Sequence, residues 1–249
     1  MNLTDKIALI TGGTRGIGAA AAIALAQAGA HVAIVGRRDD DEAKATRSAV
    51  EKLNRKCLLI AADISKPDQA RAAIEKTVAE FNSLDILVHS AGGPVNGGLL
   101  ELTPEAWHNA FDVHIHPIFH LCRSAVPHMR KKTEAAIILV SSTAGIRGIK
   151  TNVAYQTVKG AIPQLTRALA YEFAPDNIRV NCVAPGVIRT AFHAAMTEAT
   201  KQHNLEHRIP LKREGTPEQV ATVIRELITN DYITGETVVI DGGLTMRIA

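Results

Sequence analysis

The sequence has no long apolar run. Among its 249 residues, no stretch approaches the roughly 18 uninterrupted apolar residues that mark a candidate transmembrane helix. The first residues lead into a short strand-like run without the apolar core of a secretory signal peptide. We therefore expect a protein that neither spans a membrane nor is secreted, and that works in the cytoplasm.

Cysteine is scarce, and the pattern of a metal site is missing. Cys57, Cys122 and Cys182 lie far apart and form no C-x-x-C pair, which favours free thiols in a reducing compartment. His116 and His120 are four residues apart, but no acidic residue or third histidine stands at a supporting spacing. We therefore predict no bound metal.

Neither sign of charge dominates the chain. Lysine and arginine number 28 against 25 acidic residues, a formal net charge of +3, and the basic residues are scattered. Binding to nucleic acid or to an anionic membrane calls for clustered basic residues. We therefore expect a small-molecule ligand and neither of these partners. Hydrophobic residues make up 46% of the chain and aromatic ones 4%, so the core should be aliphatic.

Short apolar runs alternate with helix-favouring segments along the whole chain. The runs cover residues 6–10, 31–35, 57–61, 84–88, 136–140, 178–183 and 237–240. Unbroken alternation of this kind is typical of a parallel sheet with helices on both faces. The length alone would permit two small domains. Because no linker interrupts the pattern, we predict one doubly wound α/β domain, of the Rossmann type, over residues 1–249.

Three segments carry more detailed expectations. A helix should run from Pro104 to about Met129, with a kink or local break at Pro117. Asp63 could cap the helix that begins near Pro67. The stretch at about 187–212 contains polar residues without a strong core period, and we predict that it forms a substrate lid.

A glycine-rich loop follows the first predicted strand. Its sequence from residue 11 is Thr-Gly-Gly-Thr-Arg-Gly-Ile-Gly. Gly12, Gly16 and Gly18 allow a tight turn and a close approach to a ligand, and the helix from about Gly16 offers unpaired N–H groups to a phosphate. The pattern indicates a nucleotide site, although glycine can also simply end a strand.

The second predicted strand ends at Gly36, followed by Arg37 and Arg38. In a dinucleotide fold this strand end faces the adenosine ribose, where an acidic residue would bind a free 2′-hydroxyl. Guanidinium groups match a 2′-phosphate instead, and Arg15 lies nearby in the glycine loop. We therefore predict NADP(H) as the cofactor in preference to NAD(H). The alternative is a solvated arginine pair.

Tyr155 and Lys159 are four residues apart in a predicted helix. Side chains at this spacing share one helix face. A nearby cation favours the ionised form of a phenol, so Lys159 could prepare Tyr155 to exchange protons near neutral pH. Ser142 follows a predicted strand, at the carboxyl edge where open α/β sheets bind ligands. The three residues are candidate catalytic groups.

These motifs, in this order, resemble the short-chain dehydrogenase/reductase family over nearly the whole chain. The matching residues are Thr11-Gly12 with Gly16-Ile17-Gly18, Asp63, Ala91-Gly92, Ser142, Tyr155 with Lys159, Arg179-Val180-Asn181, Pro185-Gly186 with Thr190, Ile233-Thr234-Gly235 and Asp241-Gly242-Gly243. The resemblance implies a seven-stranded sheet and a homotetramer built on two long helices and the last strand.

The resemblance also implies roles for individual residues. Asp63 would contact the adenine ring, Ile188 and Thr190 would hold the nicotinamide carboxamide, and Lys159 would bind the nicotinamide ribose. The implied cofactor-binding residues are Gly12, Thr14, Arg15, Gly16, Ile17, Gly18, Arg37, Arg38, Asp63, Ile64, Ser90, Ala91, Gly92, Tyr155, Lys159, Pro185, Gly186, Ile188 and Thr190.

Two positions depart from the family's pattern. Ser90 stands where the family usually has asparagine before Ala91-Gly92, and His114 replaces an asparagine that is taken to hold a water in a proton relay to the lysine. A histidine can donate, accept and shuttle protons, with an unperturbed pKa of about 6.5. His114 is therefore a further catalytic candidate. The relay could persist in altered form or be lost, and His114 could equally be a packed helix residue.

The expected activity is reversible hydride transfer between NADP(H) and a carbonyl compound or secondary alcohol. Tyr155 would protonate the oxygen, Ser142 would orient it, and Lys159 would lower the pKa of the phenol. Two alternatives stay open, because one scaffold hosts many reactions. The first is a nucleotide-binding regulator without turnover. The second is a lyase, isomerase or hydrolase that uses Tyr155 as acid or base.

Overall fold

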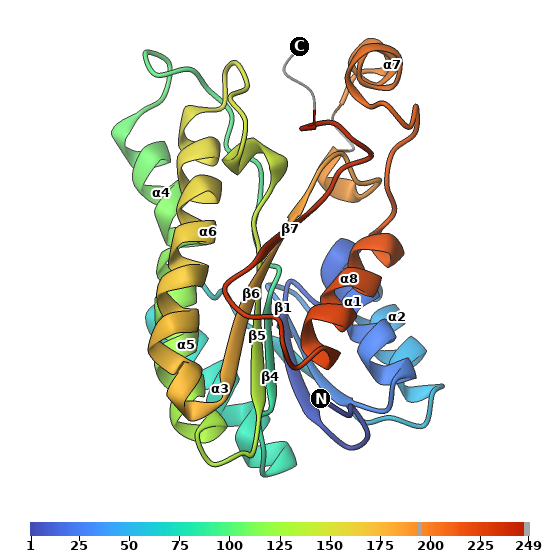
Figure 1. Cartoon of the computed structure of the whole chain (residues 1–249), viewed down its shortest axis with the longest axis vertical. Helices are drawn as coiled ribbons and strands as arrows, with labels where there is room; N and C mark the ends of the chain where they lie inside the picture. The colour runs from blue at the N-terminus through green and yellow to red at the C-terminus, as the bar shows by residue number, and fades with distance from the viewer. Residues whose placement is uncertain (194–195, 247–249) are drawn as a thin grey trace.

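Seven parallel strands form one sheet in the computed structural model, which describes residues 1–193 and 196–246 (Figure 1). The strands are β1 (Ile7–Thr11), β2 (His31–Gly36), β3 (Cys57–Ala61), β4 (Ile86–His89), β5 (Ala135–Val140), β6 (Ile178–Pro185) and β7 (Thr237–Ile240). Their order is β3-β2-β1-β4-β5-β6-β7, so the winding reverses between β1 and β4. This confirms the predicted seven-stranded, doubly wound fold. Ligands of such folds bind at the carboxyl edge near the reversal.

Helices cover both faces of the sheet (Figure 1). One face packs against α1 (Gly16–Gln27), α2 (Asp41–Glu51) and α8 (Pro217–Thr229), and the other against α3 (Pro67–Phe81), α5 (His116–Met129) and α6 (Val153–Phe173). On that second side α4 (Pro104–His114) packs against α5 and α6. Successive strand residues point to opposite faces. Leu9 of β1 accordingly packs beneath α3 and α5, while Ile10 packs beneath α1 and α8.

The long helix predicted after Pro104 is broken. Ile115 ends α4 and begins α5, which confirms the local break expected near Pro117. Pro117 occupies the first turn of α5, where its missing N–H leaves no helical bond unmade. His114, the last residue of α4 before the break, is buried in the protein interior.

Two other expectations change in detail. The idea that Asp63 caps α3 was wrong, because Lys66 holds the cap position and the Asp63 carboxylate accepts bonds from Ser65 instead. The predicted lid at residues 187–212 contains α7 (Glu198–His203) and a π-helical turn over Asn204–Arg208, although residues 194–195 lie outside the described part. Its role as a lid stays a prediction.

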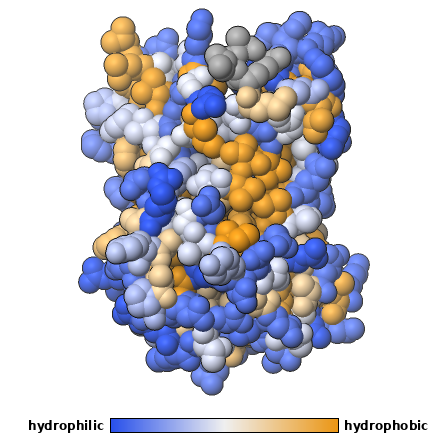
Figure 2. Space-filling model, viewed as in Figure 1, coloured by the Kyte–Doolittle hydropathy of each residue, from blue (hydrophilic) through white to orange (hydrophobic). Residues whose placement is uncertain are grey.

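The edge strand β7 is partly exposed. Val239 keeps 39% of its surface accessible, and apolar side chains gather over the region that β7 crosses (Figure 2). Unpaired edges and apolar patches are typical of surfaces that meet another chain. Among the described helices, none combines the length and apolar character needed to cross a membrane.

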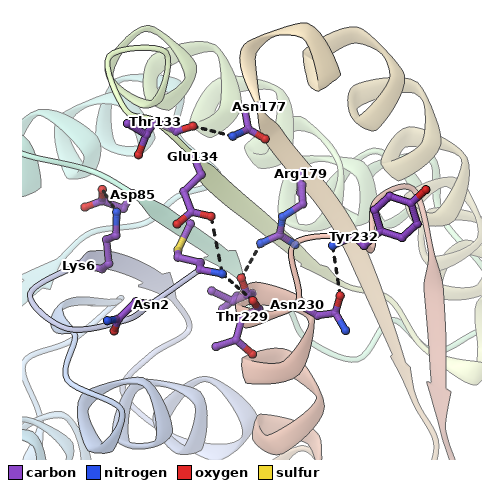
Figure 3. A network of polar contacts seen from close by, with 12 residues as sticks. Asn2, Lys6, Asp85, Thr133, Glu134, Asn177, Arg179, Thr229, Asn230 and Tyr232 are labelled. Carbon is purple, nitrogen blue, oxygen red and sulfur yellow. Dashed lines mark hydrogen bonds and ion pairs between the residues drawn. The ribbon is translucent and has the colours of Figure 1, made fainter.

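The carboxyl end of α8 is held by buried cations (Figure 3). The Arg179 guanidinium donates to the carbonyls of Leu227 and Ile228 at 2.7 and 2.5 Å. The ammonium of Met1 donates to the Thr229 carbonyl at 2.6 Å. The last carbonyls of a helix lack partners within it and attract positive charge. These bonds therefore fix α8 against the sheet at the edge opposite the predicted site.

Candidate active site

The glycine loop packs directly against the turn after β4. Gly12 has a φ of +66°, and a Cβ there would lie 2.9 Å from main-chain atoms of Ala91. Gly16 has a φ of +56°, and a Cβ there would lie 3.4 Å from the Thr190 methyl group. Both backbones favour glycine because a side chain would be strained at these angles. The loop thus brings residues from three parts of the chain together.

The first turn of α1 is open to an anion. Arg15 occupies the N-cap position, but its side chain makes no capping hydrogen bond, and the first turn carries no acidic residue. The leading N–H groups of a helix lack partners within the helix, and the dipole adds positive charge there. The glycine loop and the first turn of α1 therefore fit a phosphate group of the predicted cofactor.

The three arginines predicted to select NADP(H) occupy different environments. Arg15 forms ion pairs with Asp40 and Glu42 at 2.5 and 2.8 Å, so acidic groups already balance much of its charge. Arg37 and Arg38 are exposed at the end of β2. The two exposed arginines are therefore the better candidates for reading a 2′-phosphate.

The predicted cofactor residues gather at the carboxyl ends of the strands. The structure places Gly12, Thr14, Arg15, Gly16, Ile17 and Gly18 after β1, Arg37 and Arg38 after β2, Asp63 and Ile64 after β3, Ser90, Ala91 and Gly92 after β4, and Gly186, Ile188 and Thr190 after Pro185, which ends β6. Their contacts with a cofactor stay predictions.

Ser142, Tyr155 and Lys159 meet beside β5. Ser142 follows the strand and accepts a hydrogen bond from Ala144 N–H at 3.1 Å, which starts a short turn. Tyr155 and Lys159 lie in the first half of α6, with the ammonium 5.8 Å from the centre of the phenol ring. The Lys159 ammonium donates to the Val140 carbonyl at 2.8 Å. The helical spacing inferred from the sequence is therefore present.

Burial governs the protonation of this group. It raises the pKa of Tyr155, against the opposing effect of a hydrogen bond with Ser142. It also lowers the pKa of Lys159 to about 8. The expectation of a phenol pKa lowered by Lys159 does not hold for the protein alone, because desolvation penalises the phenolate more than these contacts stabilise it.

His114 lies at the site, but as a neutral ring. It is 1% exposed, meets the Tyr155 ring edge-on at 5.7 Å, and donates from Nε2 to the Gly93 carbonyl at 2.9 Å. Burial, and then the charge of Lys159, lower its pKa to about 3. Of the alternatives left open for His114, a relay through a ring of ordinary pKa near 6.5 does not fit this environment. A catalytic role for the neutral ring stays a prediction.

Sequence reasoning missed two residues at the site. Phe192 places its ring 6.0 Å from that of Tyr155. His89 ends β4 as a 2% exposed residue, and its Nδ1 lies 2.9 Å from Thr11 Oγ1. For His89 a signal existed, since a histidine at the carboxyl end of a buried parallel strand lies where such sheets bind ligands. No sequence signal indicated Phe192, because its segment shows no clear periodicity.

Known proteins match the chain over almost its full length. The profile of a family described as enoyl-(acyl carrier protein) reductase matches residues 12–245. The 3-oxoacyl-(acyl-carrier-protein) reductase of Chlamydia muridarum is 34% identical over 244 residues, covering 97% of this chain and 98% of that protein. Dehydrogenase/reductase SDR family member 4 of Homo sapiens is 34% identical over 253 residues, covering 99% and 90%.

A solved structure agrees with these sequence matches. L-sorbose reductase from Gluconobacter frateurii, complexed with NADPH and L-sorbose, superposes with a TM-score of 0.92 at 29% identity, covering 100% of both chains. The chain belongs to the short-chain dehydrogenase/reductase family.

Membership of the short-chain dehydrogenase/reductase family confirms the resemblance drawn from the motifs. It makes the protein an oxidoreductase and supports carbonyl and alcohol chemistry with a nicotinamide cofactor. Within the family's scaffold, His89 and His114 give this chain two buried, neutral imidazoles beside the lysine.

Gly145 allows the turn after β5 to touch the backbone of α6. A Cβ at this position would lie 2.5 Å from the carbonyl carbon and oxygen of Lys159. Ser141 Oγ donates to the same carbonyl at 2.6 Å. The position of Lys159 along the sheet is therefore set by a close backbone contact that admits no side chain.

We predict that Gly145→Ala displaces α6 from this turn. The overlap should lower the free energy of unfolding by about 1–3 kcal/mol and weaken NADPH binding. Gly148→Ala is the matched control, because a Cβ there would meet only Gln156 Oε1 at 3.9 Å. Urea denaturation and NADPH fluorescence titration measure both effects. Equal behaviour of the two variants would show that the contact does not position Lys159.

Proposed function

We propose that the protein transfers a hydride reversibly between NADP(H) and a small carbonyl compound or secondary alcohol, with Tyr155 as the proton donor and acceptor. The observation that carries this proposal is the gathering of Ser142, Tyr155 and Lys159 at the carboxyl edge of the sheet, beside the open first turn of α1. L-sorbose reductase, a structural neighbour, was solved with NADPH, which supports the choice of cofactor.

The residues at the carboxyl edge suit a bound NADP(H). The glycine loop would receive the phosphates, Arg37 and Arg38 the 2′-phosphate, and Lys159 the nicotinamide ribose. When bound, the cofactor supplies or accepts the hydride. Asp63, with Ile64, would border the adenine, and the segment from Pro185 through Gly186 and Ile188 to Thr190 would border the nicotinamide, as would the turn of Ser90, Ala91 and Gly92.

The side chains around the reacting oxygen divide the remaining work. Ser142 Oγ would donate a hydrogen bond that orients the carbonyl, and Tyr155 would deliver the proton. The raised pKa of Tyr155 keeps the phenol protonated at neutral pH, the form that reduction requires. Alcohol oxidation needs the phenolate and should therefore gain from higher pH, until Lys159 loses its charge as the pH rises through about 8.

We also propose that the protein forms a homo-oligomer, a tetramer by analogy with its family, in the cytoplasm. The exposed apolar area along β7 supports a contact with a second copy of the chain (Figure 2). β7 is also an edge strand of the sheet, so the hydrogen-bonding groups along its outer side are unpaired within the sheet. On α6, Tyr171 is 89% exposed and suits a second contact.

Tyr155→Phe should reduce carbonyl turnover by at least about 100-fold, because the proton donor is removed. NADPH affinity should stay nearly intact, as measured by fluorescence titration. Tyr232→Phe is the matched control, since this tyrosine is 97% exposed and follows α8, away from the site. Turnover in Tyr155→Phe comparable to the control would remove Tyr155 from the mechanism.

Cofactor choice gives an independent prediction. Replacing both Arg37 and Arg38 with alanine should lower kcat/KM for NADPH about 10-fold or more, because charge-assisted bonds to the 2′-phosphate are lost. The value for NADH should stay unchanged. Gly36→Asp is unsuitable, because its Cβ would lie 2.5 Å from the Thr14 side chain.

The control for the arginine variant is Arg71→Ala on the exposed surface of α3. A wild-type protein that uses NADH as efficiently as NADPH would contradict the assignment. So would a double variant that loses both cofactors to the same degree.

A further inference from the structure

A run of four acidic residues follows the two exposed arginines at the end of β2. The run covers residues 39–42, so the three arginines predicted to lie near a 2′-phosphate are accompanied by four carboxylates. Carboxylates close to a phosphate dianion weaken its binding, because like charges repel. The acidic run is therefore a feature of this segment that the proposed function does not use.

Two of these carboxylates hold the guanidinium of Arg15. Its Nη2 lies 2.5 Å from Asp40 Oδ2, and its Nη1 lies 2.8 Å from Glu42 Oε2. Each terminal nitrogen of Arg15 therefore has a carboxylate of its own. Because a guanidinium commonly binds a phosphate through two nitrogens at once, both acids compete with such a ligand for Arg15.

The fold fixes the two acids beside the glycine loop. Thr46 of α2 is buried, and its Oγ1 donates to the Thr14 carbonyl at 3.0 Å. A Cβ on Gly36 would lie 2.5 Å from the Thr14 side chain, so the end of β2 touches the same loop. The start of α2, the end of β2 and the glycine loop thus meet at Thr14, next to Arg15.

The two acids differ in their other contacts. Asp40 is the N-cap of α2, and its Oδ1 accepts from Ala43 N–H at 3.1 Å. This bond most of all, and the charge of Arg15 as well, lower the pKa of the Asp40 carboxyl. The Glu42 side chain is 56% exposed, and among residues 1–193 and 196–246 its carboxylate is found paired with Arg15 alone. The charge of Glu42 can therefore be removed without loss of the helix cap.

We propose that Asp40 and Glu42 limit the preference of this protein for NADP(H), because they compete with the 2′-phosphate for the guanidinium of Arg15. This inference rests on the cofactor of the proposed function. Arg37 and Arg38 would still attract the 2′-phosphate, so the preference is narrowed and not reversed. Exposed ion pairs are weak, so a phosphate dianion can displace Glu42 at a modest loss of affinity. The two acids are thus specificity-determining residues that act against the three arginines.

Glu42→Gln in the full-length protein tests the competition, because it removes the charge and keeps the size of the side chain. We expect the Kd for NADPH to fall about 3-fold and the Kd for NADH to stay unchanged, both measured by fluorescence titration. Glu51→Gln is the matched control. It is the same substitution at the other end of α2, where Glu51 pairs with Arg47 at 2.7 Å, and it should change neither Kd.

Two further measurements separate competition for Arg15 from other effects of charge. Asp40→Asn keeps a good helix cap without the charge, and it should give a gain in NADPH affinity similar to that of Glu42→Gln. Adenosine 2′,5′-bisphosphate and adenosine 5′-monophosphate differ only in the 2′-phosphate, so in competition titrations the gain should be confined to the bisphosphate. When Arg15 is first replaced by alanine, Glu42→Gln should no longer raise the affinity for NADPH.

Three results would overturn the proposal. In the first, neither Glu42→Gln nor Asp40→Asn binds NADPH more tightly than the wild type. In the second, the gain extends equally to NADH or appears in Glu51→Gln, which assigns it to overall charge. In the third, the gain persists in full without Arg15, which assigns it to direct repulsion of the phosphate.

The outcomes for the proposed function are separate. A wild-type protein that binds neither NADPH nor the bisphosphate would refute the proposed cofactor, and this inference with it. A protein that binds NADPH but reduces no ketone would refute the proposed activity alone, because every measurement in this test is one of binding. A wild type that binds NADPH, with variants that bind it no better, would refute this inference alone.

Discussion

The burial of the Lys159 ammonium is the constraint on which the arrangement of this site depends. A positive charge taken out of water needs hydrogen-bond acceptors and tolerates no second cation nearby. The Val140 carbonyl supplies one acceptor, and the two neighbouring histidines are neutral. Burial lowers the pKa of the Lys159 ammonium to about 8, so this group is still charged at pH 7 but loses its proton at slightly higher pH.

The same burial explains how the fold prepares the site. Gly145 lets the turn after β5 touch the backbone of Lys159, which fixes the depth at which the ammonium enters the sheet edge. The helix break at Ile115 ends α4 at His114, whose buried ring meets that of Tyr155. A glycine and a helix break, both local features of the sequence, therefore position Lys159 and His114, and burial then shifts the pKa values of these two side chains.

Much of the fold and part of the site could be predicted from the sequence. The alternation of strands and helices, the glycine loop and the spacing of Tyr155 and Lys159 depend on local periodicity, which sequence shows directly. Protonation does not, because the pKa values of Tyr155 and His114 follow from desolvation by residues distant in the chain. The partner of Asp63 and the environment of His89 likewise depend on which loops meet.

The most direct test of the account follows the hydride itself. The protein would be incubated with NADPH carrying deuterium at nicotinamide C4 and with a panel of small ketones, and the products analysed by mass spectrometry. We predict an alcohol with deuterium on the carbinol carbon, formed with the loss of reduced-nicotinamide absorbance. Consumption of a substrate without any transfer of deuterium and without cofactor oxidation would contradict it.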